Sequence, residues 1–341
     1  MPTNTIDNVW QRLIGAQKGV PVGNAYALLA DDGTFGGLSP FARYYLDPVN
    51  GDDANNGLSP SAAVLTLAAA YALTTPGQND AIILIGNGAA SGTLRVDASF
   101  TWSKDATHLI GICSPVLFSQ RARIAPTGAT TAFSPFFTIS GNGCIFQNLQ
   151  LFFGFDTGTA TEINLTVTGS RNYFGNCHIA GIGDAAAAGG TGSRSLVIGS
   201  GGSGENVFEN CVIGIDTVTR SVANASLEFV GATPRNVFRN CIFPLMTSAA
   251  GVLGILGTGN GCVDRSNVFE NCMFLNAVSS TSTVMTVLAS FTTASPGGNL
   301  IFRDCMLVGI GEWGDANALA NSYVDMAAPS ASAGGIGVNP S

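Results

Sequence analysis

Hydrophobic and polar residues follow one recurring phrase through the second half of the chain. In order, its nine positions are a polar residue, Asn, an apolar residue, Phe, a variable residue, a second Asn, Cys, a variable residue and an apolar residue. Full copies lie at 171–179, 205–213, 235–243 and 266–274, with looser copies from Ile145 and Ile301. The Phe residues are 28, 34, 30, 31 and 33 positions apart. A fixed phrase at a variable period predicts a solenoid whose coils differ only in their loops.

Each copy of the phrase predicts two short β-strands that meet at the second Asn. The apolar stretches are too short for a helix, lack its period and are rich in β-branched and aromatic residues. Asn suits the bend because it tolerates the left-handed backbone. Stacked coils would align these residues in one column: Asn148, Asn176, Asn210, Asn240 and Asn271. Because a bend resets the inward and outward alternation, a stack of Phe should lie inside, beside a stack of Cys.

This arrangement resembles the right-handed parallel β-helix, the fold of pectate lyases and of many phage tailspikes. The resemblance predicts an all-β chain: a right-handed parallel β-helix solenoid with an N-terminal capping helix and short terminal arms. We expect an N-terminal arm with a short helix over residues 1–43, the parallel β-helix over 44–310 and a C-terminal low-complexity tail over 311–341. The fold itself leaves the function open.

The first segment of the coil also fits the resemblance. Residues 44–61 are similar to the segment that leads into such coils. Ser59 is a good N-cap and Pro60 suits the first helical position, so the Ala-rich residues 62–72 are expected to form the capping helix. A strand is expected to follow over 81–85.

Composition and charge narrow the partners. Charged residues make up only 11% of the chain, which indicates that much lateral surface is buried in an assembly. The net charge of -8 argues against nucleic acid or a membrane as partner. We expect no secretory signal at the N-terminus, and no apolar stretch is long enough to span a bilayer.

The cysteines are expected to pack rather than to react. Five of them share one position of the repeat: Cys177, Cys211, Cys241, Cys272 and Cys305. Leu149 fills the same position in the first copy, so a column of buried free thiols explains the pattern better than disulfides do. The chain has no Cys-x-x-Cys pair and no Cys/His cluster with zinc spacing, and we expect no cofactor.

Charged residues on the coils alternate in sign from one copy to the next. Directly before the bend the residues are Glu209, Arg239, Glu270 and Arg303, and three positions before Phe they are Arg171, Glu205 and Arg235. Opposite charges on neighbouring strands stabilise a sheet modestly. A hydrolase on this fold needs two carboxylates that face one groove. We therefore interpret the charges as structural and expect no catalytic residue.

The remaining polar segments carry weaker signals. His178 takes an outward place in the repeat, and no Gly-x-Ser-x-Gly elbow accompanies it or His108. The Gly-rich residues 189–204 lack the features of a nucleotide site and are expected to form a flexible loop. The loop over 47–57 has enough Asp and Asn oxygens for calcium but lacks the EF-hand order, and Asx-turns explain it as well. The sequence leaves calcium open there, and we assign no metal ligand.

A candidate assembly surface comes from the residue that follows each Cys. In four consecutive copies this outward position is apolar: Val212, Ile242, Met273 and Met306. Either a loop or arm of the same chain covers this stripe, or identical chains pack along it. Trp10, Leu13 and Ile14 lie on one face of a short helix in the N-terminal arm, which should also dock on a partner.

The resemblance to phage tailspikes, together with the exclusion of other classes, implies a structural protein of a phage virion without enzymatic activity. We expect a capsid decoration or cement protein, located in the virion, which forms a homotrimer and contacts capsid or other virion proteins. The trimer follows from the resemblance to tailspikes. The alternative is a short tailspike-like protein that binds or cleaves a host glycan. A secreted pectate-lyase-like enzyme is the third hypothesis. It is disfavoured because we find neither a signal segment nor an acidic cluster on the coils.

Overall fold

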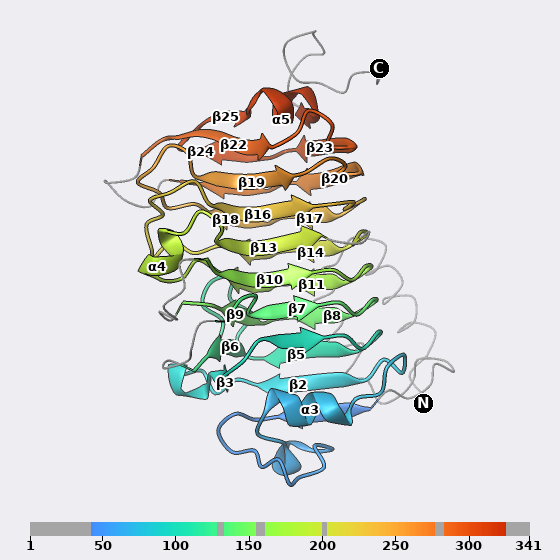
Figure 1. Cartoon of the computed structure of the whole chain (residues 1–341). Coiled ribbons are helices and arrows are strands. Elements are labelled where there is room, and N and C mark those ends of the chain that lie inside the picture. The colour runs from blue at the N-terminus through green and yellow to red at the C-terminus, as the bar shows by residue number, and fades with distance from the viewer. Residues whose placement is uncertain (1–41, 128–132, 155–160, 200–202, 277–282, 325–341) are drawn as a thin grey trace, which may run out of the picture. The chain divides into compact units, whose positions relative to one another are not determined.

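A computed structural model describes residues 42–127, 133–154, 161–199, 203–276 and 283–324, which belong to the compact unit Phe41–Ser341. These residues form three parallel β-sheets, A, B and C, and each coil passes through the sheets in that order. Figure 1 shows the strands stacked coil on coil. The right-handed parallel β-helix expected from the sequence is confirmed.

The strands of the three sheets have the following bounds. Sheet A contains β1 (Arg43–Leu46), β2 (Ala81–Ile85), β5 (His108–Ile112), β8 (Ile145–Gln147), β11 (Tyr173–Gly175), β14 (Val207–Glu209), β17 (Val237–Arg239), β20 (Arg265–Glu270), β23 (Gly298–Arg303) and β26 (Ser322–Val324). Sheet B contains β3 (Leu94–Val96), β6 (Arg123–Pro126), β9 (Gln150–Phe152), β12 (His178–Ala180), β15 (Val212–Ile213), β18 (Ile242–Pro244), β21 (Met273–Leu275) and β24 (Met306–Val308). Sheet C contains β4 (Phe100–Trp102), β7 (Phe137–Ile139), β10 (Ile163–Val167), β13 (Arg194–Gly199), β16 (Ala225–Val230), β19 (Leu253–Thr258), β22 (Met285–Phe291) and β25 (Ile310–Gly314).

The interior contains the two predicted stacks. The rings of Phe174 and Phe208 lie 4.4 Å apart with an angle of 3° between their planes, and those of Phe208 and Phe238 lie 4.8 Å apart at 6°. The Cys residues that follow the bend are free, as are all eight cysteines of the chain. Their Sγ atoms donate to backbone carbonyls, as Cys241 does to Phe208 at 3.4 Å. The core is therefore built from repeated residues that stack on their own copies.

Two Asn ladders fix the ends of the sheet A strands. At the predicted bend, Asn240 and Asn271 have φ of 53° and 52°, and the Asn271 side chain donates to that of Asn240 at 2.7 Å. The sequence analysis missed the second ladder, although the first Asn of the phrase repeats equally well. Its members are buried: Asn172, Asn206, Asn236 and Asn267. The side-chain oxygens of the last three accept the backbone N–H of the Asn one coil earlier, as Asn267 does from Asn236 at 2.9 Å, and Asn172 accepts from Cys144 N–H.

The N-terminal cap differs in detail from the prediction. Residues Pro60–Ala62 form only a 3₁₀ turn (η2), and a second such turn, η3, lies at Ala90–Gly92. The capping helix, α3, spans Leu67–Leu73 and is capped by Thr66, whose side chain accepts from the N–H of Ala69. The helix cannot begin earlier because Val64 pairs with Leu46 as an isolated β-bridge. The strand predicted over 81–85 is present as β2.

The described coil continues past residue 310, where the sequence analysis placed the tail. The strand β25 and helix α5 (Ala316–Ala320) follow, and Figure 1 shows α5 at the end of the stack opposite α3. Trp313 lies 4.9 Å from Phe302, ring to ring, and extends the aromatic interior by one layer. Another short helix, α4 (Ala185–Ala188), belongs to the loop that connects β12 of sheet B to β13 of sheet C. None of the described helices is long and apolar enough to cross a membrane.

Candidate functional site

The outer face of sheet A carries the predicted charge ladders. Arg239 lies between Glu209 and Glu270, with N–O distances of 3.4 and 3.1 Å, and Arg303 contacts Glu270 from the other side. Glu205 likewise contacts Arg171 and Arg235. The hydrogen bond from Arg235 lowers the pKa of Glu205, and the charge of Arg171 adds to this effect. These carboxylates are ion-paired, so the structural interpretation of the alternating charges is supported by geometry.

The outer face of sheet B differs along its length. In the C-terminal coils both outward columns are apolar or lack a side chain: Val212, Ile242, Met273 and Met306 in one, and Gly214, Pro244, Leu275 and Val308 in the other. Val212 is fully buried, Ile242 and Met273 are half-buried, and Met306 is 53% exposed. The predicted stripe is therefore covered at Val212 and open at Met306. Trp10, Leu13 and Ile14 lie outside the described residues.

The N-terminal coils of sheet B carry arginines instead. Arg123 packs over the ring of Phe152, with its guanidinium carbon 5.6 Å from the ring centre, and its Nε donates to Thr93. Burial lowers the pKa of Arg123, and the charges of Arg121 and Arg95 lower it further. Within the described part of the chain, no carboxylate pairs with Arg121 or Arg123. The acidic chain thus has a local group of cationic residues, Arg95, Arg121 and Arg123, which we call the arginine patch.

Both histidines are buried and held neutral. His178 faces outward from sheet B, but it is only 3% exposed because Phe118 packs against its ring and Ser119 N–H donates to its Nδ1. The sequence did not reveal this cover, since it comes from a loop two coils away. Burial lowers the pKa of His178 and of His108 to about 4. Neither residue is poised to exchange protons near neutral pH.

The acidic loop over 47–57 uses its carboxylates to organise the backbone. Asp47 accepts from the N–H groups of Val49 and Asn50, and these hydrogen bonds lower its pKa despite partial burial. Asp53 accepts from Leu65 N–H, Thr66 N–H and the Thr66 hydroxyl. No group of acidic, His or Cys side chains among the described residues has the arrangement of a metal site. Asx-turns account for this loop.

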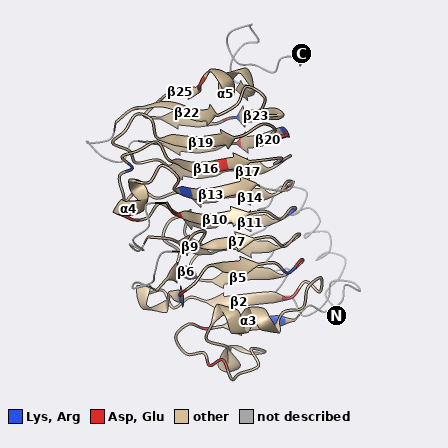
Figure 2. Cartoon of the chain, in the orientation of Figure 1, with Lys and Arg blue, Asp and Glu red and all other residues tan. Residues whose placement is uncertain are grey.

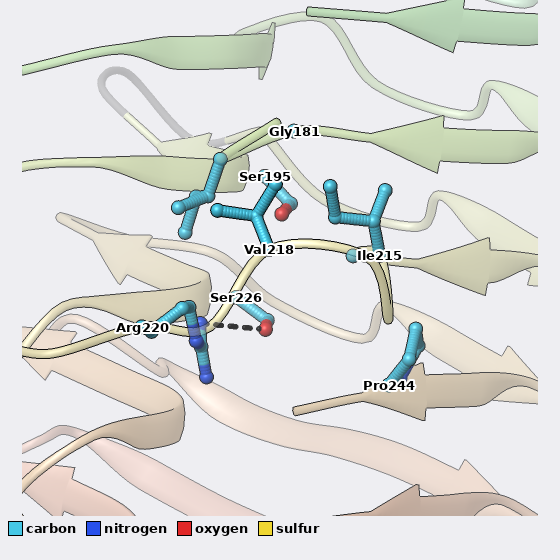
Figure 3. A pocket seen from close by; sticks show the side chains of 9 residues that line it. Gly181, Ser195, Ile215, Val218, Arg220, Ser226 and Pro244 are labelled. Atoms are coloured by element: carbon cyan, nitrogen blue, oxygen red, sulfur yellow. Dashed lines mark hydrogen bonds between the residues drawn. The ribbon is translucent and has the colours of Figure 1, made fainter. Parts of the chain in front are cut away.

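A narrow cleft lies at the corner where the coil passes from sheet B to sheet C (Figure 3). Gly181 and Gly214 follow strands β12 and β15 of sheet B, while Ser195 and Ser226 belong to β13 and β16 of sheet C. The lining residues are Gly181, Ile182, Ser195, Gly214, Ile215, Val218, Arg220, Ser226 and Pro244. A Cβ atom at Gly181 would lie 3.1 Å from the Ser195 hydroxyl. The glycine therefore keeps the hydroxyl side of the cleft open.

Arg220 is the charged residue of this corner cleft. It is 5% exposed, and its guanidinium donates to the Ser226 hydroxyl at 3.1 Å and to the Leu253 carbonyl at 3.2 Å. Among the described residues, its Nε has no hydrogen-bond partner and no carboxylate forms an ion pair with it. Burial, with a contribution from the charge of Arg194, lowers the pKa of Arg220 to about 9. A buried cation without an anion is unusual, because buried charges are normally paired.

The sequence analysis missed both the corner cleft and the arginine patch. Residues 189–204 were expected to be a flexible loop, yet Arg194–Gly199 form strand β13 and carry Ser195. A usable signal was present, since Ser195-Leu196 and Ser226-Leu227 repeat at the same register. Arg220 has no counterpart in the repeat, so only the folded coil reveals its burial.

Comparisons with known proteins identify the fold and no family. No protein-family model matches the chain, and no curated protein matches its sequence. Among solved structures, pectate lyase Pel9A is 18% identical with a TM-score of 0.50, and the match covers 78% of this chain and 63% of that one. Pectin methylesterase PemA from Erwinia chrysanthemi is 14% identical with a TM-score of 0.47, covering 87% and 94%. An alginate lyase from Paenibacillus sp. str. FPU-7 is 13% identical with a TM-score of 0.40, covering 74% and 95%.

The chain is thus similar in fold to carbohydrate-active parallel β-helix proteins. At these identities the likeness concerns the fold alone, and activity has to be argued from the chain's own residues. The outer face of sheet B and the corner cleft are the two surfaces that offer such residues.

Proposed function

We propose that the chain is a structural β-helix that packs side by side with copies of itself, as a homotrimer, through the C-terminal coils of sheet B. One observation carries the proposal: three outward apolar side chains, Ile242, Met273 and Met306, stand in register on consecutive strands. Apolar stripes of this kind mark protein–protein contacts. A decoration or cement protein of a phage virion, in contact with capsid proteins, is the role that we propose for the assembly.

The arginine patch restricts how the copies can meet. If the copies packed in parallel along the whole of sheet B, arginines of neighbouring chains would face each other at the N-terminal coils. Like charges that face each other across an interface cost roughly several kcal/mol of binding free energy. The contact is therefore proposed to begin near Ile242 and to extend toward Met306, while the N-terminal coils stay apart.

Matched lysine substitutions test the proposed assembly. Ile242→Lys with Met273→Lys would place charges in the contact, where burial without a partner is costly. The control, Val237→Lys with Val268→Lys, changes half-buried outward residues of sheet A on two paired strands. We expect the sheet B variant to sediment as a monomer with an unchanged β-sheet spectrum, and the control to remain oligomeric. A monomeric wild-type chain, or dissociation of both variants alike, would refute the proposal.

A second candidate function, binding of an acidic host glycan, is favoured by the arginine patch. Guanidinium groups recognise carboxylates and sulfates well, and Arg121 has no hydrogen-bond or ion-pair partner among the described residues. Pectate lyase and alginate lyase use the same fold, which is compatible with this candidate. Retention on a column of alginate, compared between the wild type and Arg121→Gln with Arg123→Gln, is the test. Equal retention would exclude the patch as a glycan site, and product release would indicate cleavage.

A further inference from the structure

We propose that the corner cleft is a binding site for a small monovalent anion, held by Arg220 and Ser195. Neither the assembly surface nor the arginine patch involves these residues. Both residues belong to the cleft that Figure 3 shows, Arg220 from the loop before β16 and Ser195 from β13.

Two orphan donors in one cleft carry the proposal. The Nε of Arg220 and the hydroxyl of Ser195 are both buried, and neither has a hydrogen-bond partner among the described residues. Buried donors are almost always satisfied, and an unsatisfied one costs stability. Ser226 does not fill the gap: its hydroxyl accepts from Nη1 of Arg220, and the Nε is still without a partner among the described residues. An anion that accepts from both orphan donors would satisfy them together.

The positive charge of Arg220 also calls for an anion. Arg194 and Arg220 lie near each other, and Arg194 is bound to Glu228 with an N–O distance of 2.6 Å. Glu228 also accepts from the hydroxyl of Thr258. The carboxylate is therefore engaged by Arg194, and Arg220 has no ion-pair partner in the part of the chain that the structure describes. Asp216 belongs to the same loop but forms no ion pair with Arg220.

The shape of the cleft limits the ligand to a small ion. The space between the lining residues is smaller than a water molecule, so the loop that carries Ile215 and Val218 has to move outward to admit it. Gly181 and Gly214 provide close approach to the backbone. The ligand class is a halide ion or the carboxylate of a very short acid. A sugar ring or a phosphate ester would require a larger movement of this loop than a halide ion or formate does.

Thermal unfolding in sodium formate, compared with sodium gluconate at the same ionic strength, tests the site. Gluconate is the control because its carboxylate is attached to a chain too large for the cleft. At roughly ten times the Kd, formate should raise the Tm by about 2 °C relative to gluconate, and the Tm should keep rising with the logarithm of the formate concentration. Crystals soaked in bromide should show an anomalous peak beside the Nε of Arg220.

Three variants separate ligand binding from a structural role. Arg220→Met should abolish the formate response, and Ser195→Ala should weaken it while leaving the Tm in gluconate unchanged or higher, since it removes an unsatisfied hydroxyl. Arg235→Gln, in the charge ladder of sheet A, should respond like the wild type. If Arg220→Met does not fold, the Ser195→Ala response and the bromide peak decide.

Defined outcomes overturn the proposal. Equal Tm values of the wild type in formate and gluconate would show that Arg220 only ties the loop to β16 and β19. A formate response that persists in Ser195→Ala and Arg220→Met would place the ion elsewhere. A Tm that responds to formate only after Ile242→Lys with Met273→Lys has separated the copies would mean that a second copy supplies the carboxylate in place of a free ion.

Discussion

Sheets A and B begin from the same repeated phrase and meet at one Asn bend, yet their outer faces differ. On the C-terminal coils of sheet A, from β14 to β23, the outward apolar residue of each strand, such as Val237, is next to a charged neighbour, here Arg239, in the ladder. On the C-terminal coils of sheet B no charged residue follows Ile242 or Met273 within the strand. Figure 2 shows how little of the coil carries charge at all.

The difference shows that an outward apolar residue is not by itself an interface. Long Arg and Glu side chains can cover neighbouring apolar surface with their aliphatic stems. Sheet A can therefore leave its Val residues half-buried without a partner. Sheet B has no such stems in its C-terminal coils, and Met306 stays 53% exposed.

The largest effect is expected where the sheets share one core. The ring of Phe238 lies 4.7 Å from Phe269 of sheet A, 6.2 Å from Phe243 of sheet B and 6.3 Å from Phe229 of sheet C. Phe238→Ala should lower the free energy of unfolding by roughly 3 to 5 kcal/mol, because the stack cannot collapse into the cavity. Chemical denaturation measures this, with Val237→Ala as the outward control.

The control sharpens the comparison of inner and outer faces. Val237→Ala removes part of a half-buried side chain and should cost about 1 kcal/mol or less. Similar losses for both variants would mean that the stack contributes no more than the outer face.

The next effect concerns the pH dependence of stability and His178, which lies on β12 between the N-terminal and C-terminal coils of sheet B. His178 has a pKa of about 4 in the folded chain, below its ordinary value of 6.5, so the unfolded chain binds more protons between these values. Its contribution to stability is complete above pH 6.5 and is lost as the pH falls toward 4, at up to about 1.4 kcal/mol per pH unit. His178→Gln should flatten the fall in Tm over this window.

His108 provides the internal control for that experiment. It is buried in sheet A with the same lowered pKa of about 4, and its Nδ1 accepts from Ile145 N–H at 3.1 Å. The single variant should therefore keep part of the pH dependence, and the additional change His108→Gln should remove most of the rest. An unchanged pH profile in the double variant would exclude the histidines as its cause.

The sequence predicted those parts of the molecule that repeat. The phrase placed sheets A and B, the bend at Asn240, the Phe and Cys stacks and the charge ladder, because each position packs on its own copy. Sheet C was missed in part, since its strands lie among Gly and Ser residues and vary between coils. The Ser195-Leu196 and Ser226-Leu227 pairs were its visible trace.

The candidate sites were predicted less well because they depend on single residues. Arg220 is buried by the geometry of one corner, and His178 is covered by the loop that carries Phe118. Neither contact involves a repeated position. The outward stripe was predicted from Val212 to Met306, but a matching apolar column on sheet A, which includes Val237, escaped notice.

A smaller effect tests the ladder that distinguishes sheet A. Arg239→Glu would place three carboxylates in a row with Glu209 and Glu270, and should cost about 1 kcal/mol, since Arg239 is partly exposed and screened by water. Arg239→Gln should cost less. The difference in unfolding free energy between the two variants should become smaller in 1 M salt, because the screening length falls from about 10 Å at 0.1 M salt to about 3 Å. An unchanged gap would mean that packing, rather than charge, sets the cost.

An effect of similar size is expected at the Cys column, which lies on the inner side of the bend between the two sheets. Cys241 is fully buried and free, with Sγ 3.4 Å from the Phe208 carbonyl. Cys241→Ala should therefore cost about 1 kcal/mol, the value of one small buried group, and Cys241→Ser somewhat more because a polar group enters the core. A reducing agent should leave the Tm unchanged, since no bridge is broken. A lower Tm in reducing agent would show that neighbouring coils are cross-linked, and would replace packing by covalent bonds as the reason for this column.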